Sequence, residues 1–294
     1  MLKGVALSVL ASVLFGTLYY YTTLLQPLSG QEIFGWRMLF TLPAITLFLL
    51  ASGEWHLVKN LFQRLREQPV LWLGLVLSSF LVGIQLWLFL WAPLHGHALN
   101  VSLGYFLMPL VMVLIGRFYY RERLSRLQVM AVLLAAAGAA HAVFQAGGLA
   151  WTSLLVCLGY PYYFVLRSQM KTDHLGGLWF DMLLTLPLAG YLALTGSGLS
   201  AMGSAFSALP WLVLLLGLLS AAAMVAYILS SRMLPFSLFG LLGYVEPVLL
   251  VGVALILGET ITPEALPTYL AIWLALGLLG VESWLAYRRQ KAGK

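Results

Sequence analysis

The feature that most constrains this chain is a succession of long apolar runs that charged residues rarely interrupt. Charged residues make up 9% of the 294 positions, whereas they make up about a quarter of an ordinary soluble protein. A chain with so few polar side chains cannot cover water-soluble domains of this size, so the lipid bilayer is the expected solvent. Runs of about 20 apolar residues span a bilayer as helices. Unbroken runs, rather than ten-residue alternation, favour helices over a barrel.

The charge-poor stretches predict an all-α membrane protein with ten transmembrane helices. Their expected bounds are 4–25, 32–51, 70–91, 97–116, 127–144, 149–166, 177–195, 209–231, 237–257 and 265–287. The first run is longer than the apolar segment of a signal peptide, so we expect it to remain as the first helix. The connections are short, and none could hold a separate soluble domain.

The basic residues predict which side of the membrane each connection occupies. Except for Arg37, every Lys and Arg lies at a chain end or in the connections after the second, fourth, sixth and eighth spans. Short loops that carry Lys and Arg stay in the cytoplasm. We therefore expect both termini, including a basic tail at 288–294, on the cytoplasmic side of a cell inner membrane. The net charge of +6 then reflects orientation in the membrane and not binding to nucleic acid.

The second half of the chain repeats motifs of the first half in the same order. The matching segments are 16–21 with 159–164, 36–43 with 180–187, and Leu103-Gly104-Tyr105, Pro109 and Glu122 with Leu242-Gly243-Tyr244, Pro247 and Glu259. Transporters are often built from such duplications. Since five helices per copy is an odd number, the copies enter the membrane from opposite sides. The prediction is two inverted five-helix repeats, at 1–144 and 149–287.

These motifs resemble the EamA branch of the drug/metabolite transporter superfamily along the whole chain. Within that branch, the chain most closely resembles the RarD type of chloramphenicol-sensitive proteins. The residues that carry this resemblance are segments 86–92, 102–106 and 109–110, together with Glu32-Ile33 and Arg37. Asn100 and Glu246 differ from the RarD pattern, which leaves the substrate open. The resemblance implies an inner-membrane carrier, most often an exporter, that alternates access between two halves. Amino-acid-derived metallophores and drug-like compounds are substrate classes that it suggests.

The motifs that are missing narrow the range of functions. The sequence has no ATP-binding motif, nucleophile elbow, HExxH motif or Cys/His cluster, so we expect a secondary transporter with no cofactor and no metal site. Export of a small amphipathic or amino-acid-derived metabolite is the expected function. Uptake remains open because a symmetric fold does not encode direction. A polytopic enzyme acting on lipid-linked substrates is the alternative from another class, and a non-transporting membrane receptor is a third.

Charged residues within the spans are candidate functional residues because they are costly in lipid. Arg37 and Asp181 each lie only about 6–8 Å from a span end at 1.5 Å per residue, so each could snorkel to the interface or control a gate. They occupy equivalent positions in the two repeats. Glu246 lies about 14 Å deep, near the midplane. Its carboxyl must face a cavity, find a partner or be protonated, which makes it a candidate for coupling protons or substrate.

Aromatic residues, glycines and prolines complete the predicted site. Tyr and Trp rings offer apolar faces with one polar group, proline removes a helical hydrogen bond and glycine permits close approach. The predicted substrate- or proton-coupling set is Glu246, Tyr244, Tyr105, Tyr20, Tyr163 and Trp87. The predicted gating set is Arg37, Asp181, Gly104, Pro109, Gly243 and Pro247. Packing alone would explain many of these residues singly. The expected partners are a small-molecule substrate, the bilayer and protons as a candidate coupling ion.

Overall fold

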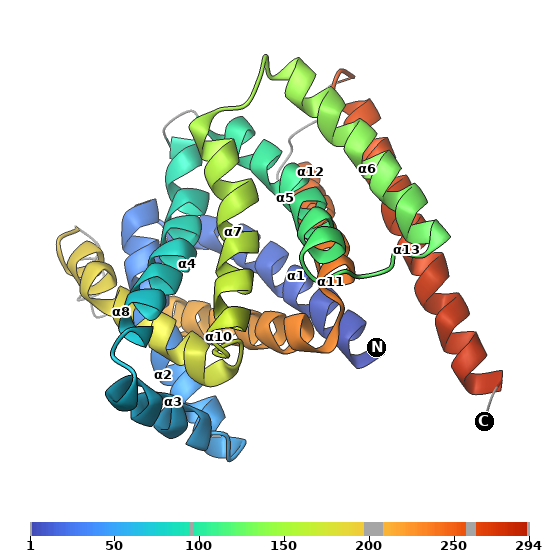
Figure 1. Ribbon diagram of the computed structural model, residues 1–294. Helices are drawn as coiled ribbons and strands as arrows, with labels where there is room; N and C mark the ends of the chain where they lie inside the picture. The colour runs from blue at the N-terminus through green and yellow to red at the C-terminus, as the bar shows by residue number, and fades with distance from the viewer. Residues whose placement is uncertain (1, 95–96, 197–207, 257–262, 293–294) are drawn as a thin grey trace. The chain divides into compact units, whose positions relative to one another are not determined.

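The computed structural model describes residues 2–94, 97–196, 208–256 and 263–292, and every regular element in these ranges is a helix (Figure 1). The α-helices are α1 (Leu2–Thr22), α2 (Gly30–Ala51), α3 (His56–Glu67), α4 (Leu71–Leu94), α5 (Ala98–Phe118), α6 (Arg126–Gln145), α7 (Trp151–Gln169), α8 (Leu175–Leu194), α10 (Leu209–Met233), α11 (Phe236–Leu242), α12 (Val245–Ile256) and α13 (Leu266–Ala292). The predicted all-α class is thus confirmed.

Seven helices among the described residues are long and apolar enough to cross a membrane. They are Leu2–Leu25, Gly30–Ala51, Leu71–Phe89, Asn100–Phe118, Arg126–Gln145, Leu175–Leu194 and Leu209–Met233. Two of the remaining predicted spans correspond to shorter apolar helices, Phe236–Leu249 and Leu266–Glu282. Helix α7 carries a Tyr-Pro-Tyr-Tyr run and Arg167, and the 237–257 span is divided between α11 and α12. The count of ten membrane spans therefore stays a prediction.

The described chain divides into two compact units. Unit 1 contains Met1–Val13, His97–Pro161 and Ser230–Lys294, and unit 2 contains Leu14–Gly96 and Tyr162–Leu229. Each unit takes segments from both predicted repeats, so these packing units are not the repeats themselves. The predicted boundaries at 1–144 and 149–287 rest on the sequence motifs.

In unit 2, α8 packs against α2, α3 and α4. Close approach between α2 and α8 depends on Gly35, because a Cβ atom there would lie 2.5 Å from the Ala189 carbonyl oxygen. Helix α2 begins at a capping box, in which Ser29 accepts from the Glu32 amide and the Glu32 carboxylate accepts from the Ser29 amide. Tight packing around α8 makes it the central element of this unit.

In unit 1, α6 lies beside α13 and α5 lies beside α11 (Figure 1). The α6 face toward α13 consists of small residues: Ala131, Ala135 and Ala139 are buried, and a Cβ atom on Gly138 would lie 3.0 Å from the Ala271 Cβ. This spacing of small residues every fourth position is a common membrane helix interface. Helix α6 also begins at a capping box, formed by Ser125 and Gln128.

One element differs from the sequence prediction, and another extends beyond its predicted span. The connection between the second and third spans, expected to be a plain basic loop, contains the amphipathic helix α3, which buries Val58, Leu61 and Leu65. Helix α13 continues to Ala292, so most of the predicted basic tail at 288–294 is helical. Helix α3 carries apolar residues at helical spacing beside its charges, and this spacing outweighs the charge density that suggested a loop.

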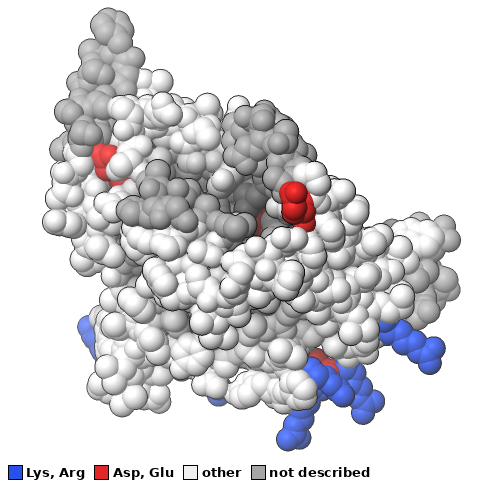
Figure 2. Space-filling view, turned by 90° about the horizontal axis from the view of Figure 1, so that it is seen from above, with Lys and Arg blue, Asp and Glu red and all other residues white. Residues whose placement is uncertain are grey.

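The described surface is largely uncharged, as expected of helices in lipid. On the face that Figure 2 shows, white side chains without charge cover most of the described area. Large apolar side chains exposed on the helices include Leu47, Leu73, Phe144 and Trp211. Such an extent of exposed apolar surface is unusual for a soluble monomer and suits contact with acyl chains.

Candidate functional site

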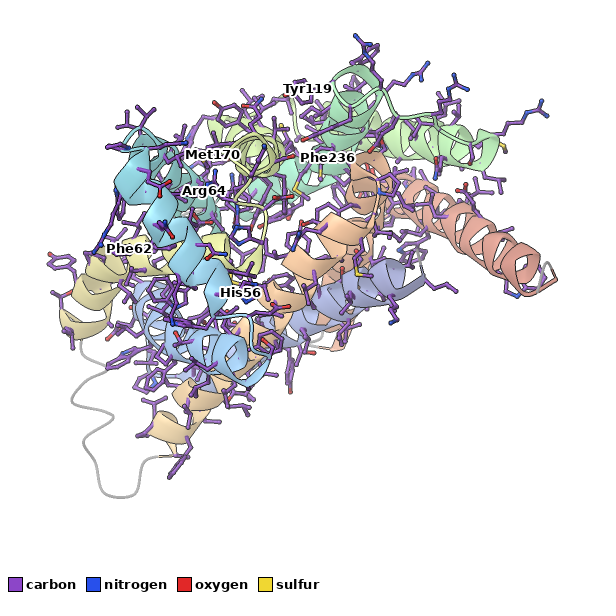
Figure 3. All side chains as sticks on the ribbon, turned by 60° about the horizontal axis from the view of Figure 1, so that its bottom comes forward. His56, Phe62, Arg64, Tyr119, Met170 and Phe236 are labelled. Atoms are coloured by element: carbon purple, nitrogen blue, oxygen red, sulfur yellow. The ribbon has the colours of Figure 1, made fainter. Side chains whose placement is uncertain are left out.

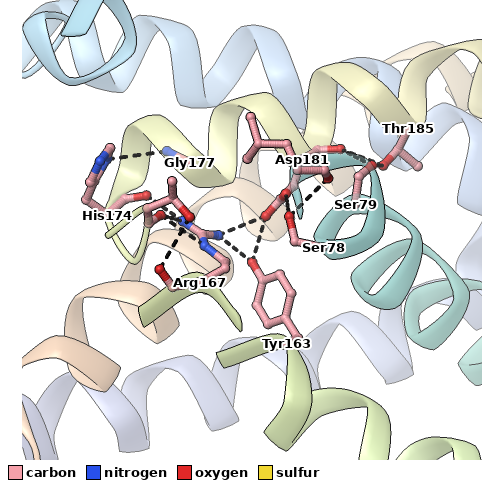
Figure 4. A network of polar contacts seen from close by, with 10 residues as sticks. Ser78, Ser79, Tyr163, Arg167, His174, Gly177, Asp181 and Thr185 are labelled. Carbon is pink, nitrogen blue, oxygen red and sulfur yellow. Dashed lines mark hydrogen bonds and ion pairs between the residues drawn. The ribbon is translucent and has the colours of Figure 1, made fainter. Parts of the chain in front are cut away.

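The centre of the candidate site is a buried ion pair in unit 2. Arg167 near the end of α7 donates from Nη1 to Asp181 Oδ2 on α8 at 2.9 Å, and their side chains are 1% and 0% exposed (Figure 4). Burying two charges costs several kcal/mol per ion unless geometry and further hydrogen bonds compensate. Both charges are extensively hydrogen-bonded here.

Asp181 is satisfied on both carboxylate oxygens. Ser78 on α4 donates to Oδ1 at 2.5 Å, and the Tyr163 hydroxyl on α7 donates to Oδ2 at 2.9 Å. Arg167 Nη1 also donates to the Tyr163 hydroxyl oxygen. Three helices are therefore joined at one carboxylate. Tyr163 and Asp181, which the sequence assigns to different roles, lie in direct contact.

Arg167 also connects this network to the turn between α7 and α8. Its guanidinium donates to the carbonyl oxygens of Thr172 and His174 (Figure 4). Arg64 on α3 donates to the neighbouring Met170 and Lys171 carbonyls at 2.9 and 3.1 Å, and Figure 3 shows Arg64 directed from α3 toward Met170. Two arginines thus hold one turn through its backbone.

Arg37 on α2 is buried in the same unit, with 6% of its side chain exposed. Its Nε atom donates to Ser220 Oγ on α10 at 2.8 Å. The snorkelling alternative is therefore wrong for Arg37 and for Asp181, because both side chains contact buried partners and do not extend to the surface. A gating role for them stays a prediction.

The surroundings of Arg37 and Asp181 correspond to each other through the sequence repeat. Ser220 is the hydrogen-bond partner of Arg37, and Ser78 is the partner of Asp181. The residue numbers of the two serines differ by 142, and those of Arg37 and Asp181 differ by 144. Thr41 donates to the Arg37 carbonyl at 2.6 Å, and Thr185 donates to the Asp181 carbonyl at 2.7 Å. Equivalent positions thus make equivalent contacts, although the two central charges are opposite.

A groove of about 490 Å³ lies between α4 and α8, beside the ion pair. Most of its wall is apolar, and its polar groups are the hydroxyls of Ser79 and Thr185 and the indole N–H of Trp87. Trp87 from the predicted coupling set lines this groove and stacks on Trp91, with ring centroids 5.1 Å apart. Tyr20, also in unit 2, is 40% exposed and lies outside the residues that line the groove.

The remaining predicted site residues belong to unit 1. Gly104 permits close packing of α5 on α7, because a Cβ atom there would lie 2.6 Å from Val156 Cβ. The Tyr105 ring lies 6.4 Å from the Tyr160 ring. Helix α5 continues through Pro109. The equivalent predicted span is interrupted at Gly243 and Tyr244, just before Pro247.

Tyr244 and Glu246 lie at this interruption. The Tyr244 side chain is fully buried, and its hydroxyl donates to the Phe106 carbonyl at 2.8 Å, which ties the junction to α5. Glu246 is half-buried in the first turn of α12. Glu122, between α5 and α6, caps the start of α11. Its carboxylate accepts from the Phe236 and Ser237 amides at 2.6 and 2.8 Å. The coupling roles of Tyr244 and Glu246 stay predictions.

Sequence reasoning missed Arg167 and the two serines. It placed Arg167 in a cytoplasmic connection because a span of ordinary length ends at 166, whereas α7 continues to Gln169. The available signal was the spacing of Tyr163 and Arg167, which lie on one face of a helix at positions i and i+4. Among the described residues no cluster of three His, Cys, Asp or Glu side chains could hold a metal ion. His95, one of two histidines in the connection between the third and fourth predicted spans, lies outside the described residues.

Long apolar helices with charged side chains buried among them define this chain as a polytopic membrane protein. A solved structure has the same fold, with a TM-score of 0.68 at 18% identity over 97% of this chain and 98% of that one. The EamA-like transporter family model matches residues 2–144. The chain belongs to this family.

Relatives along the full length support this membership. The chloramphenicol-sensitive protein RarD of Pseudomonas aeruginosa is 46% identical over 98% of this chain and 97% of its own length. A transporter of Pasteurella multocida is 42% identical over 99% of both chains. The chain is therefore a membrane transporter rather than an enzyme, as the sequence predicts.

Proposed function

We propose that the protein is a secondary exporter of the cell inner membrane that moves a small amphipathic or amino-acid-derived solute by alternating access. Ten helices in two inverted five-helix repeats, with both termini in the cytoplasm, would form the carrier. Uptake through the same fold is the second direction to be tested.

The observation that carries this proposal is the pair of equivalent contacts at Arg37 and Asp181. Each lies near one end of its predicted span, and each is hydrogen-bonded to a serine on the third helix of the other predicted repeat. Arg37 donates to Ser220, and Asp181 accepts from Ser78. In an inverted repeat, equivalent positions lie toward opposite faces of the membrane. Two equivalent polar contacts would then control opposite entrances, which is what alternating access requires.

The helix pairs support the same arrangement. The helices that pack together, α2 with α8, α5 with α11 and α6 with α13, are equivalents under the sequence repeat. When two copies are related by a two-fold axis, elements near the axis contact their own equivalents. Packing of this kind is expected of a duplicated carrier and has no reason to arise in an unrelated succession of helices.

The two proposed gates differ in strength, which gives the carrier a preferred resting state. Asp181 contacts Arg167 and Tyr163 as well as Ser78, whereas the positions equivalent to Tyr163 and Arg167 are the exposed residues Tyr20 and Leu24. The charged network at Asp181 is costly to break. We infer that the cytoplasmic entrance, where the basic residues place Asp181, is the more firmly closed one.

The solute class follows from the site and from the name of one relative. The groove beside Asp181 has an uncharged, mostly apolar wall, and the relative from Pseudomonas aeruginosa is called chloramphenicol-sensitive. Chloramphenicol is an uncharged amphipathic molecule with an aromatic ring and several hydrogen-bond donors. It is therefore a suitable first compound for measuring flux.

The test is flux of labelled chloramphenicol in proteoliposomes with an imposed pH gradient. We expect saturable, gradient-dependent movement that empty liposomes and a heat-inactivated preparation lack. Inside-out and right-side-out orientation, determined by protease access to the basic C-terminal region, gives the direction. Absence of saturable flux for chloramphenicol and for a panel of amphipathic and amino-acid-like compounds would overturn the proposal.

A further inference from the structure

We infer that the groove between α4 and α8 binds an uncharged amphipathic molecule that presents a hydrogen-bond donor to Ser79 and Thr185. We take this molecule to be the solute of the carrier, so this step rests on the proposed function. The inference concerns where the solute binds and which polar group it must carry.

The wall of the groove excludes a charged ligand. Its described lining residues are Val76, Ser79, Phe80, Gly83, Ile84, Trp87, Leu184, Thr185, Leu188 and Leu192, none of them charged. The nearby Asp181 carboxylate is fully buried and neutralised by Arg167. A ligand with a full charge would lose its hydration and find no counter-charge, which is costly in an apolar site. Aromatic rings and alkyl chains match the remaining surface.

The hydroxyl groups of Ser79 and Thr185 determine which kind of polar group the ligand can present to them. Thr185 donates its proton to the Asp181 carbonyl at 2.7 Å. The proton of Ser79 goes to the same carbonyl at 2.9 Å or to Thr185 Oγ1 at 3.2 Å (Figure 4). A hydroxyl has one proton and two lone pairs, so both protons are already used within the protein. Only lone pairs remain on these two oxygens, so a ligand group that bonds to them must be an O–H or N–H group.

An acyl chain of a lipid is the competing occupant of such a groove. It would fill the apolar wall but could not bond to the two hydroxyl oxygens, because it has no donor. The groove volume of about 490 Å³ is within the range of small-molecule sites, which are mostly apolar with a few placed polar groups. These polar groups favour the donor-bearing molecule over a lipid tail.

Two naphthalenes that differ in one donor test this inference. The purified full-length protein in detergent is dialysed against 2-naphthol and against 2-methoxynaphthalene, with empty micelles as the reference. We expect saturable binding of 2-naphthol. The methyl ether should bind about five- to tenfold more weakly, the usual value of one hydrogen bond. Equal affinity for the two compounds would overturn the donor requirement.

Two variants locate the binding. A Cβ atom on Gly83 would lie 3.6 Å from the Thr185 methyl group, an ordinary contact, so Gly83→Leu should fold and fill the groove. Its matched control is Gly190→Leu on α8, where a Cβ atom meets nothing within 4 Å. We expect Gly83→Leu to abolish saturable 2-naphthol binding and Gly190→Leu to keep it. Unchanged binding by Gly83→Leu would place the ligand elsewhere.

Replacement of the acceptor tests the hydrogen bond itself. Thr185→Val should reduce the preference for 2-naphthol over its methyl ether, because it removes one of the two acceptor oxygens. Thr41→Val removes the equivalent hydroxyl of the other repeat, which does not line the groove, and should retain the preference. Binding is measured without any flux, so a chain that binds 2-naphthol but transports nothing would contradict the proposed function alone. Transport without this binding would contradict the groove alone.

Discussion

Arg167 and Asp181 hold opposite charges at a place where neither side chain contacts solvent. The charges are compatible with burial only while both are present, because removal of one partner leaves the other charge uncompensated. Breaking a buried pair in this way typically costs about 3–5 kcal/mol. The network therefore makes a sharp prediction about stability.

We expect Arg167→Met to lower the free energy of unfolding by about 3–5 kcal/mol, measured by thermal or denaturant unfolding of the detergent-solubilised protein. The double variant Arg167→Met/Asp181→Asn should be more stable than the single one, because it removes the lone carboxylate charge. Arg66→Met is the matched control, since Arg66 is exposed and contacts the Phe62 ring. A single variant as stable as this control would show that the ion pair is not formed.

Glu246→Gln tests the predicted proton coupling. The amide keeps the size of the side chain and removes its titration, so the variant should lose flux driven by a pH gradient while solute exchange persists. Glu67→Gln, at an exposed site at the end of α3, is the control. If the pH dependence of flux in Glu246→Gln matches that of the unaltered protein, Glu246 does not couple protons.

Some site residues were predictable from the sequence, and others were not. Asp181 and Arg37 are recognisable because a charge inside an apolar run has few explanations. Ser78 and Ser220 are not, because serines are common in membrane helices and their role depends on which helix lies opposite. The residues that complete a buried charge come from distant segments, and one sequence does not show which segments meet.

At the scale of elements, α3 contributes a constraint that a simple loop would not. Its apolar face packs on α8 and its Arg64 holds the turn before α8. Gly176 makes the approach possible, because a Cβ atom there would lie 2.8 Å from the Leu57 carbonyl carbon, a backbone atom that cannot move independently.

Gly176→Ala should therefore lower the free energy of unfolding by about 1–3 kcal/mol through overpacking. Gly190→Ala, where the added methyl meets nothing within 4 Å, should be neutral or should stabilise α8 by up to about 1 kcal/mol because alanine favours the helix. The free energies of unfolding of the two variants, measured in the same detergent, test this prediction. Equal stabilities would mean that α3 does not dock on α8 at this position.

The positions of most helices were predictable because runs of apolar residues reveal them directly. The prediction missed α3 because it was made from charge alone, whereas Val58, Leu61 and Leu65 lie at helical spacing. It also treated the 237–257 span as continuous, since nothing in the apolar pattern fixes whether the backbone bonds persist through Gly243 and Tyr244. Packing of Tyr244 on α5 decides that point.

At the scale of the whole molecule, the one-sided distribution of Lys and Arg predicts the topology. A reporter fused after Lys294 should be active only in the cytoplasm, and one inserted at Gly198 only in the periplasm. Both sites lie outside the described residues, so the assay is independent of the structure. Activity on the opposite side at either site would contradict the ten-span arrangement.

The central claim is that Arg37 and Asp181 control opposite entrances of one pathway. The most direct measurement is labelling of Trp87→Cys, in a Cys157→Ala background, by an impermeant maleimide in right-side-out and inside-out vesicles. Trp87 is half-buried in the groove, so its labelling reports access. The two gate variants to be compared are Arg37→Ala and Asp181→Ala. If Asp181→Ala does not fold, Asp181→Asn is used in its place. We predict that Arg37→Ala raises labelling from the periplasmic side and that Asp181→Ala raises it from the cytoplasmic side. An increase from the same side in both variants, or no change in either, would contradict the account.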